Sequence, residues 1–415
     1  MTPELARSTP LAAAPDGRRQ DRPEVDPVRY PCLEGLRAVA AVMVVTHHAS
    51  SVAGDGVSPL VAVPAGVLDG GVAVFFVLSG FLIWRPFAQA RTERRSSPRV
   101  RPYLVRRLAR LLPAYWVALS ILAIAGAIDL GDEPWRYYLL LQPYSRETAL
   151  GGLVPAWSLS TELAFYVFVP LWDRLLRLVR TQRTVGLGIA SCIVLYVAAF
   201  AFRALVSEAD PTWRGLSFQW LPANLDLFAI GMALAVIATR GTATPTQLRP
   251  IERLASRAGL LWAVAGALLV WFLLRVGSPD LIQLADPNGA YRGFYWQQRQ
   301  WALGVFSLLL LLPLVVRPDR FGLVRRSLAS QPMVWLGTIS YGLYLWHLPV
   351  MERAAHLVSG GTGPGPLGRL AGGTSGFLLY LVVGLGVGCL IAAISWTRLE
   401  RPVQRAVARR WRVQP

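Results

Sequence analysis

The chain has 415 residues, of which 54% are hydrophobic and only 16% are charged, and its formal net charge is +18. So little charge argues against a series of soluble domains and favours an integral membrane protein. In a soluble protein this net charge would suggest nucleic-acid binding, but here the arginines lie in short connections between apolar runs, so we expect no nucleic-acid partner. The three cysteines show no metal-ligand spacing, and we expect no metal.

The first 28 residues are rich in proline, alanine, arginine and aspartate, and their apolar stretch is too short for a signal-peptide core. We predict a disordered tail there. The remaining chain predicts an all-α, polytopic protein of about ten transmembrane helices, each close to the ~20 residues needed to cross a bilayer. The predicted spans are roughly 35–53, 71–90, 110–128, 153–173, 184–203, 217–239, 258–275, 300–316, 332–351 and 374–397.

Arginines alternate between the connections of these ten spans. If the N-terminus is cytoplasmic, the inner connections and the C-terminal tail hold 27 arginines, whereas the outer connections hold 9. Basic residues accumulate in cytoplasmic loops, so we expect a multi-pass protein of the plasma membrane with both termini in the cytoplasm.

The first predicted span carries two ionisable side chains that share one helical face. An ionisable group inside a span is costly, so it is by default a functional candidate. Arg37 and His48 are eleven residues apart, which returns to nearly the same face after three turns, ~16 Å further along the axis. A donor with phosphates held near Arg37 could extend its reactive end to His48, and coenzyme A has this shape.

A histidine such as His48 suits general-base catalysis because its ordinary pKa lies near neutrality. Two alternatives remain open for it. One is a structural, hydrogen-bonded histidine between helices, and the other is a metal ligand together with His47, although adjacent histidines on a helix point about 100° apart.

The fourth and sixth spans contain carboxylates. Ser158, Glu162 and Tyr166 follow one another at intervals of four residues and therefore share a face. We expect Glu162 to be catalytic by orienting the imidazole of His48, and the alternative is a pair with a structural arginine. Tyr166, and Asp226 in the sixth span, are expected to line the substrate site.

An arginine cluster precedes the third span. Arg106 and Arg110 are predicted on one helical face with Arg107 beside it, and such clusters grip phosphates through forked hydrogen bonds. Attraction to anionic lipids and cytoplasmic topology would explain the same arginines.

Two further spans carry polar candidates. Ser79 lies in the second span without the G-x-S-x-G pattern of a hydrolase nucleophile, so packing or lining of the substrate site is favoured over nucleophilic catalysis. Tyr344 and His347 in the ninth span are three residues apart on one face, and we expect a structural or substrate-lining role for them.

Seven segments, in order, cover residues 33 to 402. They are GLRAVAAVMVVTHH, FFVLSGFLI, RRLARLLPAYW, WSLSTELAFY, LDLFAIGM, SYGLYLWHLPV and LERP. Because of these seven segments and their order, the chain resembles the membrane-bound acyltransferase-3 family. Members of this family O-acylate surface polysaccharides and, in some actinobacterial branches, macrolide antibiotics.

The resemblance implies a ten-helix membrane acyltransferase domain over residues 29–403, between the cytoplasmic tail 1–28 and a basic cytoplasmic tail 404–415. It implies an acyl-CoA donor, acetyl-CoA in particular, and a hydroxyl acceptor on a carbohydrate, a glycan precursor or a macrolide-type metabolite. It also implies His48 as the base, Glu162 in the active-site core, and donor binding by Arg37 with Arg106, Arg107 and Arg110.

This sequence departs from the family pattern in two respects. Ala73 stands where many relatives have an acidic or polar residue, and the esterase-like extra domain of some relatives is not expected here. The alternative to an enzyme is a transporter or flippase for a lipid-linked or small polar substrate, with buried charges along its path.

Overall fold

The computed structural model describes residues 30–54, 56–149, 151–179, 181, 183–208, 211–239, 245–276, 293–316, 322–359 and 372–411. Over these ranges the chain is helical and contains no strand, which confirms the predicted all-α fold. The predicted tail 1–28 lies outside the described residues.

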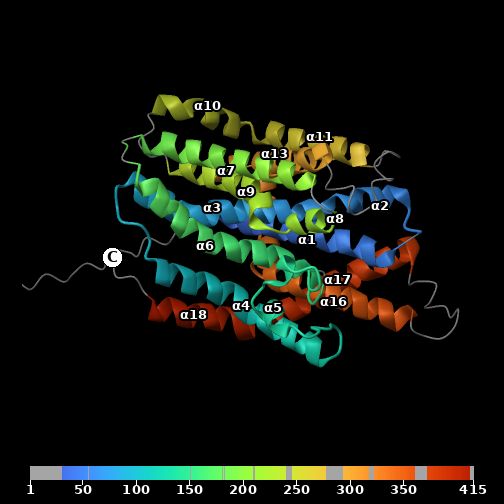
Figure 1. Ribbon diagram of the computed structural model, residues 1–415. Coiled ribbons are helices and arrows are strands. Elements are labelled where there is room, and N and C mark those ends of the chain that lie inside the picture. Colours follow the sequence, from blue (N-terminus) through green and yellow to red (C-terminus); the bar gives the residue numbers. More distant parts are fainter. Residues whose placement is uncertain are drawn as a thin grey trace, which may run out of the picture.

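The long helices run roughly alongside one another (Figure 1). The first half of the chain forms α1 (Pro31–Ala53), α2 (Pro59–Gly66), α3 (Gly71–Thr92), α4 (Val100–Ile124), α5 (Pro134–Tyr138), α6 (Trp157–Arg177), α7 (Thr184–Ser207), α8 (Pro211–Ser217) and α9 (Leu221–Ala238). The second half forms α10 (Pro245–Ser256), α11 (Ala258–Val276), α13 (Gly293–Val316), α14 (Leu323–Leu328), α15 (Gln331–Thr338), α16 (Ser340–Ser359), α17 (Gly373–Ser395) and α18 (Arg401–Arg410). Short turns of other helix types are η1 (Leu68–Gly70), η2 (Gln142–Tyr144), η3 (Val154–Ala156) and η7 (Trp396–Glu400).

Eight stretches of the described chain are long and apolar enough to cross a membrane, and there are nine if the bent pair α10 and α11 counts as one span. These coincide with nine of the ten predicted spans. The tenth prediction, 332–351, falls on α15 and α16, which are separated at Ile339 and are not among the eight or nine. The architecture is that of a multi-pass membrane protein.

Helix α1 lies in the interior of the bundle, in contact with α3, α15, α16 and α17. Glycines permit the closest approaches between helices. A Cβ on Gly231 of α9 would lie 2.0 Å from the carbonyl oxygen of Val77, and one on Gly80 of α3 would lie 2.2 Å from that of Phe228. Small residues allow helix backbones to pack closely in a membrane, so α3 and α9 form one tightly joined pair.

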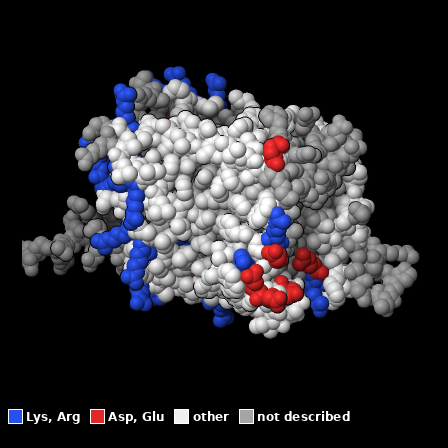
Figure 2. Space-filling model, viewed as in Figure 1, with Lys and Arg blue, Asp and Glu red and all other residues white. Residues whose placement is uncertain are grey.

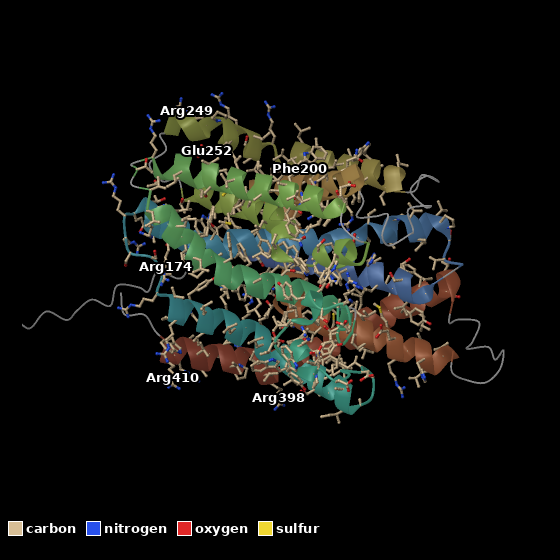
Figure 3. The ribbon with its side chains drawn as sticks, in the orientation of Figure 1. Arg174, Phe200, Arg249, Glu252, Arg398 and Arg410 are labelled. Atoms are coloured by element: carbon tan, nitrogen blue, oxygen red, sulfur yellow. The ribbon has the colours of Figure 1, made fainter. Side chains whose placement is uncertain are left out.

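Charged side chains are distributed unevenly over the surface (Figure 2). Most of the visible basic side chains gather at one end of the bundle, where Figure 3 labels Arg174, Arg249 and Arg410. Acidic side chains gather over α5 and the segments beside it. The predicted basic tail begins as part of α18, whose last residue, Arg410, lies at the arginine-rich end.

Candidate active site

Arg37 and His48 both face the interior from α1, as their spacing predicts, but they line two different cavities. Arg37 lines the first cavity, and His48 lines the second. The two cavities have Val72, Phe76 and Tyr344 in common, so they adjoin along the face of α1.

The first cavity, here called the arginine cavity, opens about 790 Å³ of empty space. Its charged lining consists of Arg37, Arg107, Arg110 and Glu162. Arg37 is largely buried, with the carboxylate of Glu34 3.8 Å from its Nε atom, and this Nε makes no hydrogen bond within the described chain. Among the lining residues three guanidinium groups stand against one carboxylate, with Glu34 beside Arg37 outside the lining, and such an arginine-rich lining suits an anionic ligand.

Glu162 belongs to the arginine cavity. Its Oε1 atom accepts hydrogen bonds from the hydroxyls of Ser79 and Tyr166, each at 2.9 Å. Ser79 and Tyr166 also line this cavity. The predicted pairing of Glu162 with His48 is therefore not what the structure has, because the two side chains line different cavities.

The three arginines of the α4 cluster do not all point to the same place. Arg107 and Arg110 line the arginine cavity, whereas Arg106 is exposed and is not part of its lining. The guanidinium carbon of Arg107 lies 6.0 Å from the ring centre of Tyr166. We predicted that Arg106 and Arg110 share one helical face. The face that lines the cavity instead carries Arg107 and Arg110, which are three residues apart.

The second cavity, here called the histidine cavity, opens about 890 Å³ of empty space. Its polar lining comprises His47, His48, Asp69, Asn224, Arg299 and Gln300. Aromatic walls are supplied by Phe76, Trp157, Phe218 and Trp296. Within the described residues no group of three or more His, Cys, Asp or Glu side chains could hold a metal ion.

Sequence reasoning missed several polar residues of the histidine cavity. Asp69 and Arg299, which form an ion pair, fall in predicted connections, so a search for ionisable groups inside spans passes over them. Asn224 and Gln300 carry no charge and give no such signal. Only the folded chain brings these residues to His48.

His48 is hydrogen-bonded to His347. The Nε2 atom of His347 lies 3.1 Å from Nδ1 of His48, and the Nδ1 atom of His347 lies 3.0 Å from the carbonyl oxygen of Leu343. A carbonyl oxygen only accepts, so Nδ1 of His347 carries the hydrogen and its Nε2 is an acceptor. His48 must then donate from Nδ1, which also lies 3.0 Å from the carbonyl oxygen of Val44. This assignment leaves Nε2 of His48 with a free lone pair.

Tyr344 lies where the two cavities meet. Its hydroxyl donates to the carbonyl oxygen of Pro155 at 3.0 Å and lies 2.8 Å from Oγ of Ser158. Both contacts are buried. Tyr344 is thus fixed in the wall between the two cavities. It lines both of them, and a structural or substrate-lining role was predicted for it.

Asp226 has a different environment from the one predicted. Its carboxylate lies 2.8 Å from the guanidinium of Arg203, and both side chains are almost fully buried. Arg203 also donates to the carbonyl oxygen of Ala223 and to the side chain of Gln297. Asp226 is not among the residues that line either cavity. Its geometry is that of a buried structural ion pair between α7 and α9.

A family model described as an acyltransferase domain matches residues 30–395. The chain belongs to the acyltransferase-3 family. This match covers most of the chain and includes both cavities, and it confirms the predicted resemblance.

Curated relatives agree with the family match. Acyltransferase MdmB of Streptomyces mycarofaciens is 28% identical over 92% of this chain and 94% of its own length. The putative peptidoglycan O-acetyltransferase YrhL of Bacillus subtilis is 26% identical over 91% of this chain and 55% of its own length. The peptidoglycan O-acetyltransferase OatA of Listeria monocytogenes is 23% identical over 77% of this chain and 49% of its own length.

The chain thus spans about half the length of the two peptidoglycan O-acetyltransferases and nearly all of MdmB. No solved structure matches it. As a member of the acyltransferase-3 family, the protein is a membrane O-acyltransferase, which favours the enzyme over the transporter.

Proposed function

We propose that this acyltransferase moves an acyl group, acetyl in particular, from acyl-CoA to a hydroxyl of a carbohydrate, a glycan precursor or a macrolide-type metabolite, with His48 as the general base. The observation that carries the proposal is the contiguity of the two cavities. One is lined by arginines and the other by histidines, and they meet at Tyr344.

The arginine cavity is proposed to hold the phosphates of the donor. Arg37, Arg107 and Arg110 offer forked donors that match phosphate oxygens, and Glu162 is the one carboxylate among the residues that line this cavity. The donor arm would then pass Tyr344 and bring the thioester toward His48. The ~16 Å between Arg37 and His48 along the helix requires a long, narrow donor of this kind.

The histidine cavity is proposed to hold the acceptor. Nε2 of His48 takes the proton of the acceptor hydroxyl while the oxygen attacks the thioester carbonyl. The C–S bond breaks as the ester forms, and the thiolate of coenzyme A leaves and recovers the proton from His48. The Nδ1 hydrogen bond to His347 supports this role, because it keeps the lone pair on the opposite nitrogen.

Glu162 receives a role different from the one expected. Its hydrogen bonds to Ser79 and Tyr166 hold it beside the arginines, where its charge keeps three guanidinium groups together. We propose that Glu162 organises the donor cavity and does not act on the proton that is transferred.

The lining of the histidine cavity supports a carbohydrate or glycosylated acceptor. Planar aromatic side chains, Trp157 and Trp296, line the cavity together with Asn224 and Gln300. The amide nitrogens of Asn224 and Gln300 donate within the protein, so these residues offer their side-chain oxygens as acceptors for hydroxyl groups. The printed names of two relatives specify peptidoglycan, whereas MdmB is named only as an acyltransferase.

We further propose that the arginine-rich end of the bundle faces the cytoplasm, with both termini on that side of the plasma membrane. Basic residues mark cytoplasmic connections, and the visible basic side chains gather at one end (Figure 2). This orientation would open the donor cavity toward the compartment that holds acyl-CoA.

The test is incubation of the purified protein with acetyl-CoA labelled in the acetyl group, together with cell-envelope glycans or secreted metabolites from cells that lack the protein. We expect mass spectrometry to find a labelled ester on one of these acceptors and free coenzyme A in equal amount. Esters formed from a different acyl donor, with acetyl-CoA unconsumed, would contradict the donor. The absence of any covalent product in both acceptor fractions would contradict the proposal.

A further inference from the structure

A third cavity opens at the arginine-rich end, where α3 ends and α6 meets α7. It is lined by Arg91, Arg94, Arg177, Val179, Thr181, Thr184 and Leu187, and opens about 930 Å³ of empty space. We call it the rim pocket. It has no lining residue in common with the arginine or histidine cavity, so the proposed transfer reaction does not account for it.

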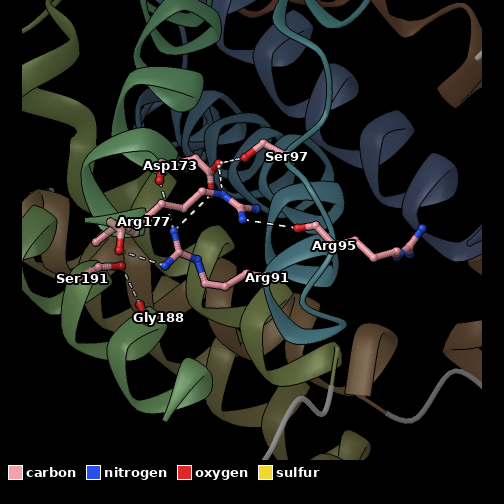
Figure 4. Close-up of polar contacts among 8 residues, drawn as sticks. Arg91, Arg95, Ser97, Asp173, Arg177, Gly188 and Ser191 are labelled. Atoms are coloured by element: carbon pink, nitrogen blue, oxygen red, sulfur yellow. Dashed lines mark hydrogen bonds and ion pairs between the residues drawn. The ribbon is translucent and has the colours of Figure 1, made fainter. Parts of the chain in front are cut away.

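Asp173 of α6 organises the arginines beside the rim pocket (Figure 4). Its Oδ1 accepts a hydrogen bond from Nη2 of Arg91 at 3.2 Å, and its Oδ2 accepts one from Nε of Arg177 at 3.0 Å. Ser97 donates to the same Oδ2. Arg91 also donates from Nη1 to the carbonyl oxygen of Leu176 at 3.1 Å. The network therefore joins α3 to the last turns of α6.

The charges around the rim pocket do not balance. Arg91 and Arg177 both bind the carboxylate of Asp173, which is almost fully buried, so a single negative charge serves two guanidinium groups and both its oxygens are already used. Glu93, the other nearby carboxylate, is paired with Arg95. Two buried donors, Nε of Arg91 and Nη2 of Arg177, have no hydrogen-bond partner in the described part of the chain.

Unpartnered buried donors and excess positive charge both suit an anion with several acceptor oxygens. A buried donor without an acceptor is unfavourable, and arginine donors match phosphate oxygens especially well. The hydroxyl groups of Thr181 and Thr184 on the same lining add polar side chains to this site.

The apolar side of the rim pocket points to a lipid as the source of the phosphate. Val179 and Leu187 line the pocket, and Leu187 begins a face of α7 that continues at Val194 and Val197. Val194 and Val197 are each 57% exposed, as expected for side chains that meet acyl chains. Basic pockets at the cytoplasmic side of membrane helices are typical binding sites for anionic headgroups.

We propose that the rim pocket binds the phosphate headgroup of an anionic phospholipid, whose acyl chains lie along α7. The bound phosphate accepts hydrogen bonds from Arg91 and Arg177. It neutralises the positive charge of these arginines that the carboxylate of Asp173 does not balance. The lipid thereby fastens the ends of α3 and α6 to α7 at the membrane surface.

Native mass spectrometry of the detergent-purified, full-length protein tests this, with dioleoyl-phosphatidylglycerol and dioleoyl-phosphatidylcholine as the probes. We expect tighter binding of phosphatidylglycerol than of phosphatidylcholine, and a loss of roughly ten-fold in the affinity for phosphatidylglycerol in Arg177→Gln, as for the removal of one charged hydrogen-bonding group. Arg177→Lys keeps a cation beside Asp173 but removes the forked donor, and it should weaken binding in the same direction without unfolding the protein.

Arg174→Gln is the matched control, because Arg174 is exposed on the same helix and does not line the pocket (Figure 3). It should leave lipid binding unchanged. Equal affinity for the two lipids, or an equal loss in Arg174→Gln, would overturn the proposal. Displacement of phosphatidylglycerol by adenosine 3′,5′-bisphosphate would assign the pocket to a nucleotide phosphate and overturn the lipid source. None of these measurements depends on acyl transfer, so they stand apart from the proposed function.

Discussion

His48 and His347, which are 299 residues apart in the sequence, meet through a hydrogen bond of 3.1 Å between Nδ1 of His48 and Nε2 of His347. The carbonyl oxygen of Leu343 fixes which nitrogen of His347 carries the hydrogen, and His347 in turn fixes that of His48. A neutral imidazole thus takes the place that a carboxylate was predicted to fill. It orients His48 without bringing a second charge into the membrane interior.

His347 is therefore expected to be a positioning residue for the base. His347→Leu removes the acceptor of the Nδ1 hydrogen bond, and we expect kcat to fall about 100-fold, at the lower end of what general-base catalysis contributes. His347→Gln, whose side-chain oxygen can accept the same bond, should recover part of this loss. Steady-state kinetics with acetyl-CoA and the identified acceptor measures both variants. If His347→Leu only lowers thermal stability and the folded fraction keeps its kcat, His347 has a packing role alone.

The two arginines of α4 that line the arginine cavity are expected to bind the donor. Arg110→Gln removes a charged hydrogen-bond donor, worth about 1.5–3 kcal/mol, so the KM for acetyl-CoA should rise at least ten-fold or so. Arg106→Gln is the control, because Arg106 is exposed outside the cavity on the same helix. A similar rise of KM in both variants would mean that general surface charge attracts the donor.

Asp226 is expected to contribute to stability and not to substrate binding. Asp226→Asn leaves the guanidinium of Arg203 buried without its counter-charge, which costs about 3–5 kcal/mol in comparable pairs. The thermal unfolding midpoint should drop well below that of Asp132→Asn, a change at an exposed position. An unchanged midpoint with a raised KM for the acceptor would restore the substrate-lining role.

The close contact of α3 and α9 predicts a sharp response to one methyl group. Gly231→Ala would place its Cβ 2.0 Å from a carbonyl oxygen, so the two helices must separate. We expect a destabilisation of about 1–3 kcal/mol, as for overpacked cores. Gly266→Ala on α11 meets nothing within 4 Å and should be nearly neutral. Thermal unfolding of both variants in the same detergent gives the comparison, and equal midpoints would contradict the tight packing of this pair.

The fold class and the inward face of α1 could be predicted from the sequence because they follow from local rules. Long apolar runs indicate membrane helices, and eleven residues return to the same helical face. The span at 332–351 was harder, because a stretch without Asp, Glu, Lys or Arg does not reveal the break at Ile339 that separates α15 from α16.

The partners of the candidate residues could not be predicted, because they depend on which helices become neighbours. Glu162 and His347 are both polar groups in spans, and the sequence does not say which of them reaches His48. The same holds for Asp226, whose partner Arg203 lies in the last turns of α7, at the last position of the predicted span 184–203. Periodicity places a side chain on a face, whereas tertiary contact decides what it meets.

The most direct test of the account compares His48→Gln with His47→Gln in purified protein of equal thermal stability, by the rate at which coenzyme A is released from acetyl-CoA in the presence of acceptor. The neighbouring histidine lines the same cavity but is held through its Nδ1 atom, which lies 3.1 Å from the carbonyl oxygen of Ala65. We predict that His48→Gln loses about 1,000-fold or more in rate, within the range for removal of a general base, while His47→Gln keeps most of its activity. A folded His48→Gln protein that transfers the acyl group at the wild-type rate would contradict the account.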